Sequence, residues 1–320
     1  MAFLSKNLRK SICYDDYWRF AYLRQEAFKS SVNNISQHSD EVLDLYKFTN
    51  CYRVLDRTTQ YLIKNVIYSG DFDAADTFFR ILLFKIFNKI ETWERIEKVI
   101  GVLTINSFEF RRYSDALHAI KLGNKIYSAA YIMPSGKNEY GSTVKHENNL
   151  RMLELMLNKN FQEKVWKQAS LKNVYDLFLG IPSIGRFLAY QYATDIGYSK
   201  FSSISEDQFV VAGPGALRGI KKCFPEAKVS DSTNIIEYMA EVQDEEFYRL
   251  GYDFKYLENR KLQLIDCQNL FCELDKYLRV KRPEYNLGNS RIKQKYRKNS
   301  NRIEYFFPPH WNVCLPMERL

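Results

Sequence analysis

Apolar residues recur every three to four positions along most of this chain, which is the spacing of one face of an α-helix. The pattern predicts helices in the first half at residues 15–29, 52–68, 73–88, 91–102, 107–122 and 145–158. It predicts further helices in the second half near residues 160–168, 171–179, 184–195, 215–223, 231–250 and 263–280. Strand signals are scarce, and residues 302–307 (RIEYFF) are the best candidate for a short strand. The pattern therefore predicts an all-α fold.

A segment rich in turn-forming residues interrupts the helical pattern near the middle of the chain. Residues 133–143 (MPSGKNEYGST) contain a proline and two glycines, a composition that is typical of a loop. We place the domain boundary here, with an N-terminal helical lobe of residues 1–140 and a second lobe of residues 141–320. A single domain whose two halves share a cleft is the alternative.

The chain is basic, with 47 Lys and Arg against 38 Asp and Glu and a net charge of +9. Six of the positive charges, and no negative charge, fall within residues 291–302. Such a segment suits a DNA phosphate backbone, although a solvated basic loop would have the same sequence. The aromatic content of 15% likewise suits either a well-filled helical core or the stacking of bases on aromatic rings.

Cysteine usage and the lack of long apolar runs limit the class of protein. Six cysteines are present without a CxxC pair, so reduced thiols in a cytosol are the simpler interpretation. Cys267 and Cys272 do not have zinc-knuckle spacing, and the four-cysteine pattern of an iron–sulfur centre is absent. No signal peptide is evident, and no stretch approaches the roughly 18 apolar residues of a membrane span. We expect a cytoplasmic protein with no metal, cofactor or membrane contact.

Residues 181–185 (IPSIG) separate two predicted helices and have the composition of a tight hairpin turn. Pro182 fixes one backbone dihedral, Gly185 permits a left-handed one, and Ser183 can cap the next helix. The amides and the positive dipole end at the start of such a helix can hold a DNA phosphate. We therefore expect Ser183, Ile184 and Gly185 to contact phosphate, although a turn between two structural helices would look similar.

Carboxylates follow this turn at an interval that suits catalysis. Glu206 and Asp207 lie 21 and 22 residues beyond Gly185, and helix–hairpin–helix DNA glycosylases place a catalytic aspartate at about that interval. Cleavage of the base–sugar bond builds positive charge on the sugar, which a buried carboxylate can stabilise. Asp195 is a third candidate, and the choice among the three stays open. Phe187 stands where strand-nicking glycosylases carry a Schiff-base lysine, so we expect base removal without strand cleavage.

A second candidate phosphate site lies where a glycine-rich turn, with Gly213 and Gly215, opens a predicted helix. Arg218 and Lys221 on that helix add positive charge. No Lys-Ser or Lys-Thr pair follows the glycines, so the segment is not a Walker loop.

Polar side chains at helical spacing are the candidates for a base and sugar pocket. Amides within an apolar helix need hydrogen-bond partners, which a ligand or another helix can supply. Structural networks between helices are therefore the alternative. The candidates are Asn50, Arg53, Asp56, Arg57, Gln60, Tyr127, Tyr131, Gln268, Asn269, Glu273 and Lys276.

Six runs within residues 46–311 carry a family resemblance: YKFTNCYRVLDRTTQYLI, FRILLFKIFNKIETWE, IYSAAYIMPSG, PSIGRFLAYQYATDIGYS, FVVAGPGALRGIKKCF and LQLIDCQNLFCELDKY. The chain resembles the α-glutamyl/putrescinyl-thymine pyrophosphorylase family, which includes the helical domain of 5-hydroxymethyl-deoxyuridine DNA kinases. That family is related to helix–hairpin–helix DNA glycosylases and is associated with hypermodified bases in phage DNA. It includes an anti-phage glycosylase of α-glucosylated hydroxymethylcytosine, to which this chain is similar. The resemblance implies a helix–hairpin–helix DNA glycosylase-like fold with two helical lobes around a cleft.

Together these features predict a monofunctional DNA glycosylase, a hydrolase that flips out a glucosylated hydroxymethyl-pyrimidine and leaves an abasic site in anti-phage defence. The expected partner is double-stranded DNA carrying modified bases, without an obligate protein partner. Two alternatives stay open. One is an enzyme that processes a phosphorylated or pyrophosphorylated hydroxymethyl-pyrimidine during DNA hypermodification, and the other is a non-catalytic binder of modified DNA.

Overall fold

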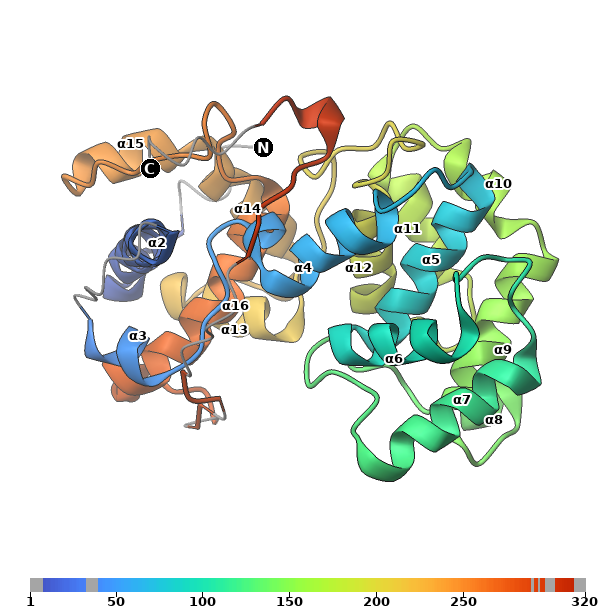
Figure 1. Cartoon of the computed structure of the whole chain (residues 1–320). Helices are drawn as coiled ribbons and strands as arrows, with labels where there is room; N and C mark the ends of the chain where they lie inside the picture. The colour runs from blue at the N-terminus through green and yellow to red at the C-terminus, as the bar shows by residue number, and fades with distance from the viewer. Residues whose placement is uncertain (1–7, 33–39, 289–290, 293, 297–302, 314–320) are drawn as a thin grey trace. The chain divides into compact units, whose positions relative to one another are not determined.

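The computed structural model describes residues 8–32, 40–288, 291–292, 294–296 and 303–313. The chain divides into two compact units: unit 1 comprises residues 1–56, 209–305 and 312–320, and unit 2 comprises residues 57–208 and 306–311. Every regular element among the described residues is helical (Figure 1), which confirms the all-α prediction. The predicted lobes of residues 1–140 and 141–320 divide the chain elsewhere, at a point that lies inside unit 2.

Unit 1 is built around α16 (Leu264–Lys281), which contacts α2 (Ile12–Val32), α13 (Pro214–Cys223) and α14 (Ser232–Glu241). Two glycines let α13 approach α16 closely. A Cβ on Gly219 would collide with the Phe271 carbonyl, and one on Gly215 would collide with the Cys272 sulfur. The start of α13 is therefore held against the middle of α16. The remaining elements of this unit are α3 (Glu41–Leu45), η1 (Arg53–Leu55), η3 (Val229–Asp231), α15 (Gln243–Arg249) and η4 (Pro283–Tyr285).

Unit 2 has α5 (Ala74–Phe87) at its centre, in contact with α6 (Ile90–Ile100), α9 (Lys145–Asn158), α10 (Phe161–Trp166) and α12 (Arg186–Ile196). The α5 sequence FFRILLFKIF is buried on every side, as expected of a helix that is apolar all round. Asp73 caps its first turn, and Asn88 ends it in a left-handed conformation. The other elements of unit 2 are α4 (Arg57–Tyr61), η2 (Leu62–Ile67), α7 (Phe110–Gly123), α8 (Lys137–Tyr140), α11 (Leu171–Leu179) and η5 (Pro309–Trp311).

Two predicted helices are interrupted in the structure. Residues 52–68 form the short 3-10 turn η1, then α4, then the π-helix η2, in which the Tyr68 amide donates to the Ile63 carbonyl five residues back at 3.0 Å. Residues 231–250 divide at Val242 into α14 and α15. The spacing of apolar residues predicts which face of a helix is buried. It does not predict which carbonyl accepts the hydrogen bond of each backbone amide. The pattern therefore located these helices without locating their breaks.

The short strand predicted at residues 302–307 is wrong for the part that the structure describes. Residues 303–308 form neither helix nor strand, because a strand needs the edge of another strand to complete its hydrogen bonds. The Phe306 amide donates instead to the Gln60 side chain at 2.7 Å. Most of the basic charges at residues 291–302 fall on positions 293 and 297–302, which lie outside the described residues. None of the described helices has the length and apolarity needed to span a membrane.

Candidate functional sites

The predicted hairpin is a tight turn between α11 and α12 in unit 2. The Ile184 amide donates to the Ile181 carbonyl at 3.0 Å, and the Tyr140 hydroxyl donates to the Pro182 carbonyl at 3.0 Å. The left-handed conformation was predicted for the glycine, but it falls on Ser183, whose φ is 70°. The turn is thus held from two sides, by its own backbone and by α8.

The first turn of α12 begins at an exposed position. Gly185 is the N-cap, with an extended backbone and no side-chain hydrogen bond to the helix. The prediction that Ser183 caps this helix is wrong, because Ser183 lies two residues before the N-cap and is turned into the left-handed conformation. Gly185 and Arg186 are both exposed. First-turn amides without a side-chain cap can bind an anionic oxygen such as that of a phosphate.

The three candidate carboxylates lie in three different environments of unit 2. Asp195 is fully buried on α12, and its Oδ2 lies 2.8 Å from the Lys85 ammonium. Glu206 is buried and accepts a hydrogen bond from the Tyr198 hydroxyl at 2.7 Å. Asp207 is exposed. The adjacent acids 206 and 207 therefore do not form one carboxylate pair.

An aromatic stack lies over the buried ion pair. The Lys85 ammonium is 4.0 Å from the centre of the Tyr131 ring, a cation–π contact. This ring also contacts Phe187 of α12, at 6.0 Å between centroids and nearly parallel. Tyr127 donates to the Asn149 side chain at 2.7 Å, and burial raises the pKa of its hydroxyl. The structure therefore places the Tyr131 ring against the first turn of α12.

The predicted phosphate site at the start of α13 belongs to unit 1. Gly213 is the N-cap and makes no side-chain cap. Gly215 packs on α16. The two cations assigned to phosphate are engaged within the unit: Arg218 lies 3.0 Å from Asp275, and Lys221 donates to a backbone carbonyl at 3.2 Å. Burial alone would raise the pKa of Asp275, but its bond from Arg279 and nearby cations lower it. These two side chains support the fold of unit 1.

A cluster of charged groups forms where α16 meets the segment before η1 in unit 1. Glu273 accepts a hydrogen bond from the Thr49 amide at 3.2 Å, and Asp56 accepts one from the Asn50 amide at 2.9 Å. Two carboxylates are thus held by two consecutive backbone amides. Lys276 forms an ion pair with Glu273. We call Asn50, Asp56, Glu273 and Lys276, together with Arg24, the α16 cluster.

Arg24 of α2 fixes the backbone that carries these amides. Its Nε donates to the Thr49 carbonyl at 2.9 Å, and its Nη2 donates to the Asn50 side chain at 3.0 Å. The pKa of Asp56 is raised to about 7, because burial and the charge of Glu273 outweigh the lowering effects of the Asn50 amide, Arg24 and Arg53. A half-buried carboxyl group with this pKa can exchange a proton near neutral pH.

The other predicted pocket residues make different contacts, although the charge of Arg53 acts on Asp56 and lowers its pKa. Gln268 is buried and donates to Asn269 at 3.2 Å. Arg53 is buried, and its amide donates to a carboxylate of α16 at 2.7 Å. Arg57 and Gln60 belong to unit 2. The structure therefore gathers Asn50, Asp56, Glu273 and Lys276 from the predicted set.

Two charged residues that make contacts at the described sites were not among the predicted site residues. Lys85 stands within the apolar run FFRILLFKIF, and an ammonium in a buried helix needs a counter-charge, so its position was a usable signal. Arg24 lies in a helix with several other charged residues. No pattern marks it, because its partners come from a loop some 25 residues away.

The cysteines and the metal-ligating residue types were compared with the requirements of thiol and metal sites in the described part of the chain. Its cysteines are free thiols, and burial raises the pKa of Cys272 to about 11, which disfavours a nucleophilic thiolate at neutral pH. In the same part of the chain no three His, Cys, Asp or Glu side chains are grouped to hold a metal ion.

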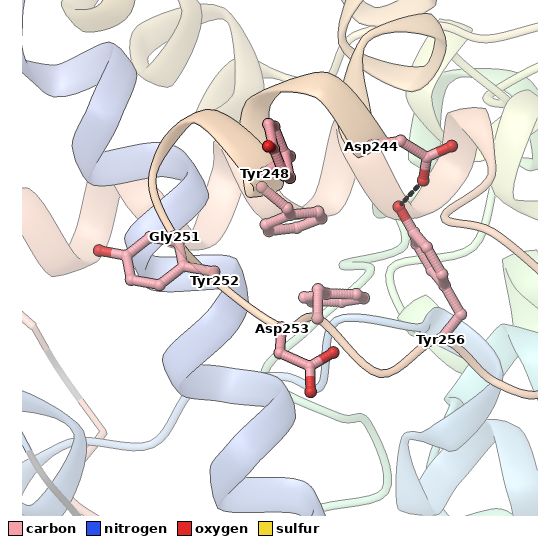
Figure 2. A pocket seen from close by; sticks show the side chains of 8 residues that line it. Asp244, Tyr248, Gly251, Tyr252, Asp253 and Tyr256 are labelled. Carbon is pink, nitrogen blue, oxygen red and sulfur yellow. Dashed lines mark hydrogen bonds between the residues drawn. The ribbon is translucent and has the colours of Figure 1, made fainter.

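A separate surface pocket of about 420 Å³ lies on unit 1 around the end of α15 (Figure 2). Figure 2 shows the Tyr256 hydroxyl directed at Asp244, which it meets at 2.6 Å. Lys261 pairs with Asp244, and Lys255 pairs with Asp253, so the carboxylates are already compensated. The lining residues are Asp244, Phe247, Tyr248, Gly251, Tyr252, Asp253, Phe254 and Tyr256. None of them was among the predicted site residues.

Comparison with known proteins gives a family and one similar relative. Residues 11–287 match the family model described as 5-hmdU DNA kinase, helical domain. The chain is also 26% identical over 292 residues to a 5-hmdU DNA kinase of Bacillus phage SP10, an alignment that covers 84% of this chain and 45% of the relative. The chain therefore spans less than half the length of that relative. No solved structure matches.

These matches overturn the predicted activity. The family and the relative are both named for a kinase that acts on a hydroxymethylated base in DNA, so the interpretation as a DNA glycosylase, a hydrolase that leaves abasic sites, is wrong. The interval between the turn and residues 206 and 207 matches the catalytic spacing of glycosylases only along the chain. In the structure one of these acids is bonded to a tyrosine and the other is exposed. The alternative of processing a phosphorylated hydroxymethyl-pyrimidine agrees better with the relatives.

Proposed function

Because the chain belongs to the family of the 5-hmdU DNA kinase helical domain, we propose that it recognises a hydroxymethyl-pyrimidine in DNA. We propose further that it processes this base in a phosphorylated or pyrophosphorylated form and leaves the glycosidic bond intact. The sequence has no glycine-rich loop followed by Lys-Ser or Lys-Thr, the usual cradle for nucleotide phosphates. We therefore assign the chain to the chemistry at the base and not to phosphate transfer from a nucleotide.

The observation that carries this proposal is the α16 cluster. In displacement of a phosphate or pyrophosphate from the 5-methylene carbon, the oxygen of water or the nitrogen of an amine forms a bond to that carbon as the C–O bond to the phosphate breaks. A base takes the proton of the nucleophile, and cations stabilise the departing anion. Asp56 has a pKa of about 7 and would take the proton. Lys276 is only partly exposed, and Arg24 already holds the adjacent backbone. These two cations would stabilise the phosphate oxygens.

DNA binding is assigned to the turn before α12. The uncapped first turn of this helix, with Gly185 and Arg186 exposed, supports a contact with one backbone phosphate. In this proposal the turn acts in the manner of a helix–hairpin–helix motif, and the partner is duplex DNA that carries the modified base. The net charge of +9 favours such a partner.

The test uses duplexes with one 5-hydroxymethyl-deoxyuridine, either free, phosphorylated or pyrophosphorylated, with and without magnesium. Mass spectrometry of the digested nucleosides should show conversion of a phosphorylated form with the base still attached. Asp56→Asn should slow this conversion about 100-fold or more, the usual contribution of a general base. Asp207→Asn removes an exposed carboxylate outside the cluster and should leave the rate unchanged. Release of the free base, or an unchanged rate in Asp56→Asn, would overturn the proposal.

A second candidate function is binding of modified DNA without catalysis. It is favoured by the turn before α12, because an uncapped helix start can grip phosphate without any reactive group. In the same experiment this function would give tight, modification-dependent binding and no new nucleoside. Asp56→Asn would then leave binding unchanged.

A further inference from the structure

We infer that Gln268 and Asn269 of α16 read the hydrogen-bonding edge of the substrate base and select a uracil ring over a cytosine ring. This inference rests on the proposed processing of a hydroxymethyl-pyrimidine at the α16 cluster. Neither residue belongs to that cluster, but both lie on the helix that carries Glu273 and Lys276. A residue pair that sets the base preference there would define the substrate class of the site.

The part of α16 between Leu264 and Leu278 is open to solvent along one stripe. Within this range Asn269, Cys272 and Lys276 are half-buried, and every other residue is buried. The three positions are three and four residues apart, so they follow one face of the helix. A ligand that reaches this stretch of α16 therefore meets Asn269 at one end and Lys276 at the other.

The segment before η1 and the start of η1 lie along the same part of α16. The Thr49 amide donates to Glu273 at 3.2 Å, and the Arg53 amide donates to Asp266 at 2.7 Å. Asn269 lies between these two attachment points, about one helical turn from each. It is therefore on the part of α16 that the α16 cluster occupies.

Two hydrogen-bonding groups at this position have no partner among the described residues. Gln268 is 1% exposed, and its Oε1 atom accepts no hydrogen bond from them. Its Nε2 donates to the Asn269 Oδ1 at 3.2 Å, which leaves the Nδ2 group of half-buried Asn269 without an acceptor in the same part of the chain. A buried amide oxygen without a partner is destabilising. The pair thus offers one acceptor and one donor to a ligand.

This combination complements a uracil ring. Uracil has the O4 acceptor beside the N3–H donor, whereas cytosine has an N4 donor beside an N3 acceptor. Once the base is unpaired and its edge is accessible, the Asn269 Nδ2 donates to O4 and the Gln268 Oε1 accepts from N3–H. With cytosine two donors would face each other and two acceptors would face each other, so neither bond could form. A site of this kind rejects the wrong base strongly, because its own polar groups are then left unpaired.

The spacing along α16 also fits the substrate. Asn269 and Lys276 are seven residues apart, which is about 10 Å along the helix axis. A base edge held at Asn269 would direct the phosphate on the 5-methylene carbon toward Lys276, one of the two cations assigned to it. Separate residues of one helix would thus hold the ring and the phosphate, so the base preference can change without loss of the phosphate contact.

The experiment uses the full chain and duplexes that carry one phosphorylated 5-hydroxymethyl-deoxyuridine or one phosphorylated 5-hydroxymethyl-deoxycytidine. Fluorescence anisotropy measures binding, and mass spectrometry of the digested nucleosides measures conversion. The wild-type protein should convert the uracil form at least about 100-fold more efficiently. Asn269→Asp replaces the donor by an acceptor that the N4 group of cytosine can use, so it should lower this preference about 100-fold or more. The matched control is Asn259→Asp, which makes the same change at an exposed position of unit 1 and should keep the preference.

Gln268→Met distinguishes a contact with the base from a purely structural role. Methionine has nearly the same length and no amide, so this variant removes the buried oxygen that has no partner. Its thermal unfolding should therefore occur at the wild-type temperature or above it, while its binding of the uracil form should weaken about tenfold. If Gln268 only filled the core, binding would stay unchanged.

The outcomes separate this inference from the proposed function. Equal conversion of the two bases by the wild type, a preference for the cytosine form, or an unchanged preference in Asn269→Asp would overturn the base reading and leave the proposed processing intact. If the wild type neither binds nor converts either phosphorylated form, the proposed function fails and the inference fails with it. Thermal unfolding of Asn269→Asp at the wild-type temperature would show that folding is not the cause. Gln268→Met decides the matter if Asn269→Asp does not fold.

Discussion

Two sites of this molecule, one in each unit, handle buried charge in opposite ways. In unit 2 the Lys85–Asp195 pair is closed: the two groups are 2.8 Å apart, and both side chains are at least 97% buried. In unit 1 the α16 cluster places two carboxylates on consecutive amides, with Asp56 only half-buried and its pKa raised to about 7. The first arrangement satisfies its charges. The second leaves one proton to be gained or lost.

The difference shows which kind of buried charge supports a fold and which kind supports chemistry. A closed pair is costly to break, because the remaining charge has no water to solvate it. A pair of like charges that shares a site is instead relieved by a proton, so it gains stability when one member is neutral. We therefore expect substitutions in the closed pair to be felt mainly in stability, and substitutions in the α16 cluster to be felt mainly in activity and in pH dependence.

The largest effect on stability should come from opening the closed pair. Lys85→Met leaves the Asp195 carboxylate buried without its ammonium, which should cost about 3–5 kcal/mol of unfolding free energy. Urea unfolding measures this loss. The double variant Lys85→Met with Asp195→Leu removes both charges and should recover much of it.

The matched control for this prediction is an exposed pair of the same chemistry. Lys172 and Asp176 on α11 lie 2.6 Å apart with about half of each side chain in water, so Lys172→Met should cost less than about 1 kcal/mol. If Lys85→Met and Lys172→Met lowered the unfolding free energy by similar amounts, burial of the ion pair would not be the cause of the larger effect.

A smaller effect, on the order of 1–2 kcal/mol after solvent screening, should appear as a pH dependence that traces to Asp56. Its pKa rises from the ordinary 3.8 to about 7 in the folded protein, so between these values the folded chain holds a proton that the unfolded chain has lost. The unfolding free energy should therefore fall as pH rises through this window. Asp56→Asn should flatten that fall, which urea unfolding at pH 4.5 to 8 would detect.

The opposite slope at Asp56, with stability rising over the same window, would show that this carboxyl group is an ordinary paired acid. Asp207→Asn is the control, because Asp207 is an exposed carboxylate outside the cluster. It should keep the wild-type pH profile.

The smallest effect should lie at the turn before α12. Ser183 has a left-handed backbone with φ of 70°, which glycine adopts without steric cost, so Ser183→Gly should stabilise the chain by up to about 1 kcal/mol. Gly185 has an ordinary φ and open space where a methyl group would lie, so Gly185→Ala should change stability very little. Thermal unfolding of both variants tests this prediction. A large loss of stability in Gly185→Ala would show that the strained backbone conformation lies at Gly185 and not at Ser183.

The sequence was sufficient for the features that depend on local pattern. Apolar spacing predicted the helices because each buried face repeats with the helical turn, and the position of the turn before α12 followed from the same spacing. The π-helix η2 and the break at Val242 were missed, because they depend on which carbonyl each amide bonds.

The sites depend on contacts between distant parts of the chain and were predicted only in part. Asp56 and Glu273 were both chosen as polar groups at helical spacing, but only the fold places them on consecutive amides, 224 positions apart in the case of Thr49 and Glu273. The glycosylase interpretation, which the family match and the relative overturn, also relied on spacing along the chain. An interval of some twenty residues is a separation along the sequence, and it does not predict where the two carboxylates lie in space.

The π-helix η2 changes the directions in which the side chains before and after it point. Gln60 and Tyr68 consequently both contact Phe306, which comes much later in the chain. Gln60 accepts the Phe306 amide, and the ring of Tyr68 lies 5.4 Å from the ring of Phe306. In a regular α-helix eight residues would turn these two side chains about 80° apart, and the wider π turn reduces this angle. One additional residue per turn thus lets a single helical stretch near the start of unit 2 hold the returning segment of residues 306–311 at two points.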